Sequence, residues 1–409
     1  MSRYSIRRVH LPTRAAMLAE LGESRRTQAE EFAAQYRRFG GALKVTVRAS
    51  ILSADLMAAF SLRGITCLWV SASTAYLFAA PDAFEGLARR LAFSNSQEEI
   101  FAAELAHFLA RQQRDHFVIK SPQRSLEAGG RTLVMGVLNC TPDSFSDGGR
   151  YLSKSAAVEH GLQMVEAGAD IIDVGGESTR PAGTYGAGAQ PVSEAAEMER
   201  VLPVITALAK STAALISIDT YKSLVAEAAI QAGAGMVNDI SGLQFDPHMP
   251  EVVEHYHVPV VIMHVKGTPR DMQQNPRYEN VIDELYQYFE VQAEVARLAA
   301  IPRERLIIDP GLGFGKRLRD NYDILLRLEE FRGLGCPILV GPSRKSFIGQ
   351  VLGLPVDQRL EGTAAAVAMA VAHGAHLVRV HDVREMSRVV RIVDTILGHT
   401  EPVAGGGGA

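Results

Sequence analysis

Eight short apolar runs recur between residues 133 and 382, and segments with a helical pattern, rich in Ala, Glu, Leu and Arg, separate them. The runs are rich in Val, Ile and Leu, as strands buried on both faces are. They cover residues 133–139, 171–176, 215–219, 236–239, 260–264, 306–309, 338–343 and 377–382. Eight strand–helix repeats predict an α/β fold, a (β/α)8 TIM barrel.

Polar residues stand at or just after the carboxyl ends of nearly all of these runs. In a TIM barrel these strand ends meet at one face, and active sites lie there. The first candidates for a functional site are therefore Asn139, Asp219, Asn238, His264, Asp309, Lys345, Arg379 and His381. The pattern predicts an enzyme.

Residues 1–120 predict a small α+β domain of unknown role that precedes the barrel. Helical patterns cover 14–39 and 54–62, a third follows Pro81, and a fourth, strongly amphipathic, covers 97–111. Alternating patterns predict strands at 44–49, 67–72 and 75–80. We assign 121–131 to a polar linker, 132–398 to the barrel and 399–409 to a Gly-rich disordered tail.

Composition excludes several other classes of protein. The 409 residues exceed the ~250 typical of one barrel, and 47% hydrophobic with 22% charged content is ordinary for a soluble domain. The apolar stretch 363–373 is too short to span a bilayer, and the first residues lack a signal peptide pattern. Three cysteines without a CxxC motif suit a reducing compartment, so we expect a cytoplasmic protein.

Charge is distributed unevenly along the chain. The first 120 residues carry 16 Lys and Arg against 11 Asp and Glu, and the remainder is acidic. Four basic residues nevertheless fall near predicted strand ends: Arg180, Lys316, Lys345 and Arg379. An acidic body with basic residues at the barrel mouth predicts a local anion site rather than a nucleic-acid surface.

The first two strand-to-helix loops are long and polar. Residues 139–149 read NCTPDSFSDGG, and residues 175–190 contain several glycines. Such loops are typical of mobile catalytic segments that close over a substrate and exclude water.

Seven motifs, taken together, resemble the dihydropteroate synthases over residues 132–398. They are NCTPDSFSDGG at 139–149, GGESTRP at 175–181, SIDT at 217–220, VNDI at 237–240, IDPGLGFG at 308–315, GPSRKSF at 341–347 and RVHDV at 379–383. The resemblance implies a transferase of folate biosynthesis and a target of sulfonamides. Its reaction joins 6-hydroxymethyl-7,8-dihydropterin pyrophosphate to p-aminobenzoate, releasing 7,8-dihydropteroate and pyrophosphate. Residues 1–120 lie outside the resemblance.

The resemblance also implies roles for individual residues. The pterin pocket would use Asp219, Asn238, Asp309 and Lys345, and a catalytic role would fall to Asp219, Asp309 and Lys345. Carboxylate and amide groups suit the donors and acceptors of a pterin edge. The p-aminobenzoate slot would use Phe145, Thr179, Arg180, Pro181, Phe314 and Ser346, the last at the expected start of a helix.

Pyrophosphate would bind Asn139, Arg379 and His381, and Asn139 would also be a ligand of Mg²⁺. Arg379 and His381 alternate along the last strand, so both face the barrel interior, and closure of a barrel places that strand beside the first. We expect small-molecule substrates, a homodimer, and neither nucleic acid nor membrane as a partner.

Two other functions remain open from the residues alone. One is a methyltetrahydrofolate:corrinoid methyltransferase, a related pterin-binding barrel that needs no pyrophosphate site. The other is a pterin-binding protein without catalytic activity. Three residues receive no chemical role: His264, Lys316, interpreted as solvating its loop, and Cys140, interpreted as buried packing.

Overall fold

The computed structural model describes residues 4–11, 16, 20–21, 29–39, 41–47, 56, 60–62, 64–71, 73–91, 96–140, 150–177, 192–268 and 271–401. The chain divides into two compact units. The N-terminal unit comprises Met1–Arg114, Tyr278–Val291 and Leu326–Gly335. The barrel unit comprises Asp115–Arg277, Gln292–Leu325 and Cys336–Ala409.

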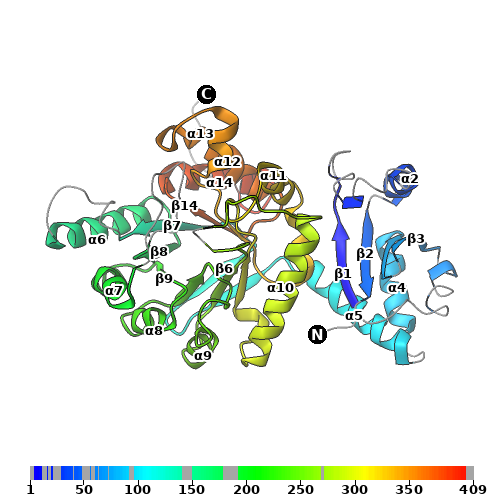
Figure 1. The fold of residues 1–409 in the computed structure, drawn as a ribbon, viewed down its shortest axis with the longest axis horizontal. Helices are drawn as coiled ribbons and strands as arrows, with labels where there is room; N and C mark the ends of the chain where they lie inside the picture. The colour runs from blue at the N-terminus through cyan, green and yellow to red at the C-terminus, as the bar shows by residue number, and fades with distance from the viewer. Residues whose placement is uncertain are drawn as a thin grey trace. The chain divides into compact units, whose positions relative to one another are not determined.

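Eight parallel strands form the barrel, in the order β12-β11-β10-β9-β8-β7-β14-β13. A parallel bridge between Ile308 and Ile338 joins the two ends of this order. The strands, drawn in Figure 1, are β7 (Leu133–Asn139), β8 (Ile171–Gly175), β9 (Leu215–Asp219), β10 (Met236–Asp239), β11 (Val260–Met263), β12 (Leu306–Asp309), β13 (Leu339–Val340) and β14 (Leu377–Val380). The predicted (β/α)8 barrel is confirmed, as is the pairing of its first and last strands, β7 and β14.

Four strands end earlier than their apolar patterns predicted, β8 and β11 by one residue and β13 and β14 by two or three. β13 ends at Val340 rather than at 343, because Gly341 is followed by Pro342, which has no N–H to donate to a ladder. β14 ends at Val380 rather than at 382, and the N–H of His381 donates to the hydroxyl of Ser343. After the ends of β13 and β14, side chains therefore point into the mouth of the barrel.

Helices surround the strands (Figure 1). They are α6 (Arg150–Glu166), α7 (Glu194–Ser211), α8 (Ser223–Gln231), α9 (Met249–His255), α10 (Val281–Leu298), α11 (Leu318–Leu326), α12 (Ser346–Leu352), α13 (Leu360–Ala372) and α14 (Val383–Ile396). The amphipathic α14 buries Val383, Met386 and Val390, as expected for a helix that covers a sheet. None of the described helices is long and apolar enough to cross a membrane.

Residues predicted as a linker instead help to form a hairpin of the barrel unit. β5 (Phe117–Lys120) pairs antiparallel with β6 (Ser125–Ala128). Phe117, Ile119 and Ala128 are buried in one cluster with residues at or near the starts of the barrel strands, such as Leu133 and Ile171. The boundary between the two units therefore lies at Arg114 rather than at 120. Phe117 and Ile119, the alternate buried residues of β5, pack against the starts of the barrel strands. The last predicted segment, 399–409, is described only to residue 401.

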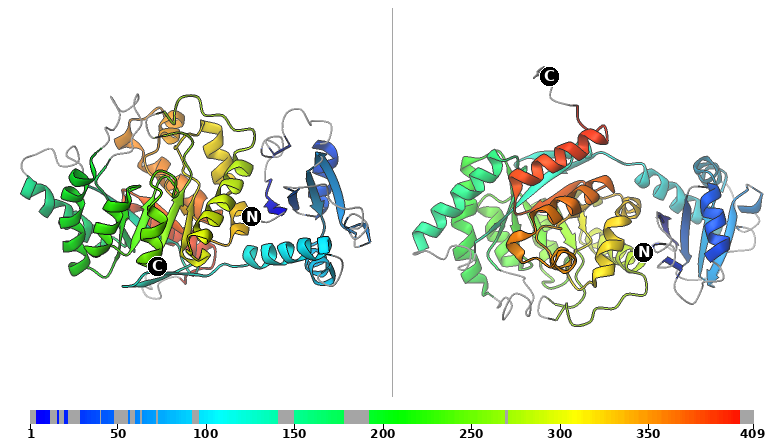
Figure 2. Two further views of the ribbon diagram at one scale, coloured as in Figure 1. Left: turned by 60° about the horizontal axis from the view of Figure 1, so that its bottom comes forward. Right: turned by 90° about the horizontal axis from the view of Figure 1, so that it is seen from above.

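The N-terminal unit contains a four-stranded antiparallel sheet in the order β1-β2-β4-β3 (Figure 2). Its elements are β1 (Tyr4–Val9), α2 (Ala29–Phe39), β2 (Ala42–Val47), β3 (Thr66–Ser71), β4 (Thr74–Phe78), α4 (Pro81–Leu91) and α5 (Ser96–Gln112). One face of the sheet packs on α4 and α5 through residues such as Leu77, Leu87 and Phe101. The other face packs on Phe32 of α2. The strands predicted at 67–72 and 75–80 are confirmed as the antiparallel pair β3 and β4, and the last two predicted helices are confirmed as α4 and α5.

Strand β1 was not predicted from the sequence. Its Arg7 and Arg8 interrupt the apolar alternation, yet Arg7 is buried, 3% exposed. Arg7 lies opposite Lys44 of β2, and Lys44 lies opposite Tyr76 of β4, so three polar side chains form a row across the sheet. A buried charge of this kind requires partners.

Carboxylates of the same unit supply these partners. Glu20 contacts Arg7 at 2.7 Å, Lys44 at 3.0 Å and Arg327 at 2.6 Å, and it accepts a hydrogen bond from Tyr76 at 2.7 Å. Burial opposes ionisation of Glu20, but the three cations outweigh it and hold its pKa well below the usual value.

Two further carboxylates, both outside the first 114 residues, complete this ion cluster. Asp283 at the start of α10 pairs with Arg7 at 2.6 Å and also with Lys44. Glu330, in the 3₁₀ helix Leu328–Leu334, pairs with Arg327 at 2.6 Å. Buried ion pairs add little net stability, but they are costly to break. The cluster therefore fixes which segments of the chain associate in this unit.

Replacing Glu20 by Ala should destabilise the protein strongly, because three cations would lose their common buried partner. We expect a loss of ~3–5 kcal/mol, measured by urea or thermal unfolding of the full chain. Glu85→Ala is the control, since Glu85 is half-exposed and its contact to Arg89 spans 4.0 Å; its loss should stay below ~1 kcal/mol. Equal effects of the two variants would contradict the stabilising role of the cluster.

Candidate active site

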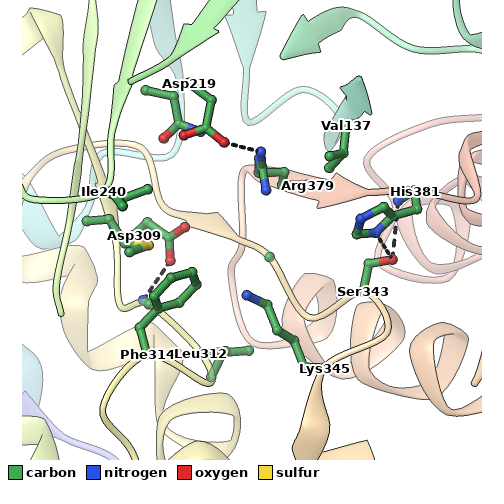
Figure 3. A pocket seen from close by; sticks show the side chains of 14 residues that line it. Val137, Asp219, Ile240, Asp309, Leu312, Phe314, Ser343, Lys345, Arg379 and His381 are labelled. Carbon is green, nitrogen blue, oxygen red and sulfur yellow. Dashed lines mark hydrogen bonds and ion pairs between the residues drawn. The ribbon is translucent and has the colours of Figure 1, made fainter. Parts of the chain in front are cut away.

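A pocket opens at the carboxyl ends of the barrel strands (Figure 3). Strands β9, β10, β12 and β14 and the segments that follow β13 and β14 supply its polar side chains. Its lining consists of Val137, Asp219, Asn238, Ile240, Met263, Asp309, Gly311, Leu312, Phe314, Gly341, Ser343, Lys345, Arg379 and His381. The pocket thus combines acidic, amide and basic groups over an apolar floor.

Arg379 is held between two carboxylates. Its Nε donates to Asp173 at 2.6 Å and its Nη2 donates to Asp219 at 2.6 Å, the second contact being drawn in Figure 3. Burial disfavours the guanidinium charge, but Asp173 and Asp219 outweigh it and raise the pKa of Arg379. Burial also raises the pKa of Asp219 to about 7, against the opposing effect of Arg379.

Asp173 is a functional residue that the sequence pattern did not single out. It lies in the middle of β8, is fully buried, and accepts hydrogen bonds from both Arg379 and Nδ2 of Asn238, the latter at 2.8 Å. Nδ2 of Asn238 has two N–H donors and only one is engaged in this way, so Asn238 can offer a ligand its second N–H and its carbonyl oxygen. A carboxylate inside an otherwise apolar strand was the signal that could have identified Asp173.

Asp309 and Lys345 also line the pocket (Figure 3). Oδ1 of Asp309 accepts the N–H of Gly311 at 2.7 Å, which fixes the side chain and leaves further acceptor positions. Burial raises the pKa of Asp309 and, reinforced by Arg379, lowers that of Lys345 to about 8. Nζ of Lys345 lies 4.1 Å from the centre of the Phe314 ring, a cation–π contact.

His381 enters the pocket beside Arg379. Its Nδ1 lies 3.0 Å from the hydroxyl of Ser343. Burial, with Arg379 as the second cause, lowers the pKa of His381 to about 3, so the ring is neutral. Arg344, in the same loop as Ser343, forms a two-pronged ion pair with Asp382. These contacts hold the ends of β13 and β14 together.

Lys222 contacts described residues on both sides of the loop between β8 and α7. Its Nζ pairs with Glu177, which follows β8, and contacts Glu197 of α7 at 2.5 Å. It also donates to the carbonyl oxygen of Val192 at 2.8 Å. The last described residue before the segment 178–191 and the first after it thus share one cation.

The structure brings most of the predicted site residues together and places others elsewhere. Seven line the pocket: Asp219, Asn238, Asp309, Phe314, Lys345, Arg379 and His381. Asn139 ends β7 and Ser346 begins α12, as predicted, but neither is part of the lining. Phe145, Thr179, Arg180 and Pro181 fall outside the described residues.

Lys316 was expected only to solvate its loop, and this was wrong. The residue is 3% exposed, and its Nζ contacts backbone and side-chain atoms of His264 and the carbonyl of Phe314. Cys140 is buried, as expected, and burial raises its thiol pKa to about 12. A thiol of that pKa is not a nucleophile at neutral pH.

The family of pterin binding enzymes has a sequence model that matches residues 135–381 of this chain. The matched region contains every residue of the pocket lining. The chain belongs to the pterin-binding enzyme family. Within it the chain groups with the dihydropteroate synthases, which are transferases. A dihydropteroate synthase of Synechocystis is 45% identical over 288 residues, covering 70% of this chain and 98% of the relative.

Solved dihydropteroate synthases have the same barrel. The Yersinia pestis enzyme in a sulfonamide complex superposes with a TM-score of 0.64 at 39% identity, covering 69% of this chain and 100% of that one. The Xanthomonas albilineans enzyme in complex with 7,8-dihydropteroate superposes with a TM-score of 0.61 at 38% identity, covering 68% and 98%. About 30% of this chain lies outside each of these matches, and the family model begins at residue 135.

The raised pKa of Asp219 has a consequence for stability in the absence of ligand. Between the pKa of an unfolded Asp, about 3.9, and the folded value of about 7, the folded state keeps a proton that the unfolded state has lost. The stabilising contribution of Asp219 is therefore complete below pH 4 and is lost as the pH rises to about 7.

Asp219→Asn removes this titration. We expect the melting temperature of the variant, minus that of the unsubstituted protein, to become more positive from pH 5 to pH 7 and then to level off. Differential scanning fluorimetry across a buffer series measures it. A difference that does not change with pH would show that Asp219 ionises in the folded protein as it does in the unfolded chain.

Proposed function

We propose that this chain performs the dihydropteroate synthase reaction at the pocket in the barrel mouth. The substrates would be 6-hydroxymethyl-7,8-dihydropterin pyrophosphate and p-aminobenzoate. One observation carries the proposal: two groups that can accept ring N–H donors, Asp309 and Asn238, share a pocket with Arg379, a cation suited to a departing pyrophosphate. A methyltetrahydrofolate:corrinoid methyltransferase has no pyrophosphate to bind, so Arg379 and His381 count against that alternative.

The pterin ring would lie between the acidic wall and Lys345. Asp309 keeps acceptor capacity beyond its bond to Gly311, so it can receive the N–H donors of the pyrimidine edge. The carbonyl oxygen of Asn238 adds an acceptor, and Lys345 provides a donor for the ring's own acceptor atoms. Asp309 and Asn238 are buried and Lys345 is partly buried, so their contacts would form in a low-dielectric environment, where hydrogen bonds are stronger.

The reaction is a substitution at the pterin's exocyclic methylene carbon. The amine nitrogen of p-aminobenzoate forms a bond to that carbon, the bond from carbon to the pyrophosphate oxygen breaks, and the amine loses one proton. An aryl amine is already nucleophilic at neutral pH, so no activated Ser or Cys is required. The protein's task is to orient the reactants and to stabilise the charges that separate. Asp219 and Asp309 would stabilise positive charge that develops on the ring.

Arg379 would couple binding of the leaving pyrophosphate to binding of the pterin ring. Without ligand it contacts Asp173 and Asp219. Pyrophosphate would compete for Nη2 and release Asp219 to accept from the ring, while Nε would stay on Asp173. Binding of the leaving group would in this way prepare the carboxylate that supports the pterin.

We also propose Mg²⁺ as the cofactor, with Asn139 as its protein ligand. Asn139 ends β7, the strand that pairs with the Arg379 strand β14. One amide oxygen fits an ion that commonly takes most of its ligands from phosphate and water. When bound, the ion would neutralise charge on the leaving pyrophosphate.

The p-aminobenzoate slot would adjoin Phe314 and Lys345. Phe314 lines the pocket, and the N-terminus of α12 at Ser346 follows Lys345 directly. Thr179, Arg180, Pro181 and Phe145 remain proposed members of the slot. Sulfonamides, which share the shape of p-aminobenzoate, would compete there.

We also propose that the protein is a homodimer in the cytoplasm. Exposed apolar side chains occur along α12, the 3₁₀ helix Val356–Gln358 and α13, and α12 contacts α13; they are Val351, Leu352, Val356, Leu360 and Met369. Such a surface in one part of a protein favours association with a second copy. Sedimentation velocity would measure the mass in solution.

The direct test of the proposed function is turnover of the two substrates by the purified protein. We expect pyrophosphate and 7,8-dihydropteroate to form in equal amounts, and the rate to fall when Mg²⁺ is chelated. Pyrophosphate release is followed by a coupled assay and the pteroate by chromatography. Tight pterin binding without any product would instead favour the non-catalytic alternative.

Arg379→Ala should impair recognition of the diphosphate group far more than recognition of the pterin ring. We expect kcat/KM for the pterin pyrophosphate to fall by at least about 30-fold, because a contact to a buried charge is worth about 2 kcal/mol or more. Affinity for the pterin alcohol, which lacks the diphosphate, should fall far less when measured by calorimetry. Arg319→Ala is the control, since Arg319 is half-exposed on α11 and pairs with Asp323. An equal loss for both ligands would remove Arg379 from the anion site.

A further inference from the structure

We propose that Lys316 is a positioning residue for p-aminobenzoate: it holds the loop that carries Phe314 in the conformation that places the Phe314 ring against Lys345. The inference rests on the proposed function, because the slot it shapes is the one assigned to p-aminobenzoate. Lys316 is not among the residues that line the pocket, so any effect on substrate must pass through the loop.

The ammonium of Lys316 has three partners. Nζ donates to the carbonyl oxygen of Phe314 at 2.9 Å and to that of His264 at 3.2 Å, and it lies 3.0 Å from Nδ1 of His264. Three acceptors match the three donors of an ammonium group. His264 follows β11, so one buried side chain joins the ends of two neighbouring barrel strands, β11 and β12.

The backbone around this lysine leaves little room for another arrangement. Gly311 and Gly315 have φ of +68° and +61°, a region that favours glycine. A Cβ on Gly311 would lie 2.1 Å from the carbonyl oxygen of His264, and one on Gly315 would lie 2.4 Å from that of Lys266. The loop therefore packs directly against the segment 264–266, and the side chain of Lys316 bridges the loop and this segment.

Phe314 is held from both sides of the loop. The N–H of Gly313 donates to Asn321 at 2.7 Å, and Nε2 of Gln273 donates to the carbonyl of Gly313 at 2.5 Å. Lys316 adds the contact to the carbonyl of Phe314 itself. On the pocket side the Phe314 ring faces Nζ of Lys345 (Figure 3). A shift of the Phe314 backbone would therefore move the ring that borders the slot.

The contact survives loss of a proton from the lysine. Burial lowers the pKa of Lys316 to about 7 and lowers that of His264 well below its usual value, so the imidazole is neutral. A charged Lys316 donates to Nδ1 of His264. A neutral Lys316 keeps both carbonyl contacts and accepts from Nδ1 in the other imidazole tautomer. The loop is thus held in either state.

Lys316→Met tests the proposal, because Met has a similar length and no donor. Two buried carbonyls and one ring nitrogen would lose their partner. We expect the KM for p-aminobenzoate to rise about tenfold or more, while the Kd for the pterin stays within about threefold. Arg317→Met is the matched control: the neighbouring cation, half-exposed and paired with Asp320, whose loss should leave both constants within about twofold.

A double-mutant cycle shows whether Lys316 acts through Phe314. In a Phe314→Ala background, Lys316→Met should raise the KM for p-aminobenzoate by less than about twofold, because the ring to be positioned is gone. A full tenfold rise in that background would overturn the proposal, as would an unchanged KM in the single variant, or equal losses of pterin and p-aminobenzoate affinity.

A second variant covers the case in which Lys316→Met does not fold. His264→Leu removes one of the three partners, and we expect a rise in the KM for p-aminobenzoate of about threefold with an unchanged Kd for the pterin; no rise would contradict the proposal. Failure of the proposed function is distinguishable, because the unsubstituted protein would then itself show no turnover.

Discussion

The site depends on one partly buried arginine that two carboxylates hold in place. Arg379 lies in the interior of a barrel of apolar strands, where an isolated charge would be very costly. Asp173 of β8 and Asp219 of β9 offset that cost, and Asp173 also orients Asn238. The positions of the groups that would contact the pterin and its leaving group are therefore mutually dependent. A change in any one of these residues changes the electrostatic balance of the others.

The same compensation of buried charges by buried partners occurs in the N-terminal unit. There, Glu20 joins Arg7, Lys44 and Arg327, and the partners come from segments far apart in the sequence. In the barrel mouth the cluster leaves acceptor and donor positions facing a pocket. In the N-terminal unit the cluster is buried among its own partners. The difference between a binding site and a structural cluster lies in whether polar groups remain for a ligand.

Sequence reasoning predicted the barrel well, because eight apolar runs with helices between them leave few other folds. It also predicted seven of the pocket residues, since polar residues at strand ends share one face of a barrel. It missed Asp173 because that residue lies inside a strand, where its partner Arg379 is distant in sequence. It missed the role of Lys316 for a related reason: the burial of a lysine in a glycine-rich loop depends on contacts with His264, 52 positions away.

The N-terminal unit was predicted less completely for the same physical reason. Strand β1 contains Arg7, whose burial makes sense only with partners such as Glu20 and Asp283. The 117–128 hairpin was predicted in part as a linker because Pro122 and Gly129 suggest irregular structure. Its apolar residues, however, pack on the barrel strands. The local pattern of apolar residues identifies helices and strands. Which polar residues are buried depends instead on ion pairs and contacts between segments far apart in the sequence.

The most direct test of this account is a crystal structure with a non-reactive analogue of the pterin pyrophosphate. The account predicts that Nη2 of Arg379 leaves Asp219 for the diphosphate, that Nε stays on Asp173, and that Asp309 and Asn238 contact the ring. A diphosphate bound elsewhere, with Arg379 still bridging both carboxylates, would contradict it.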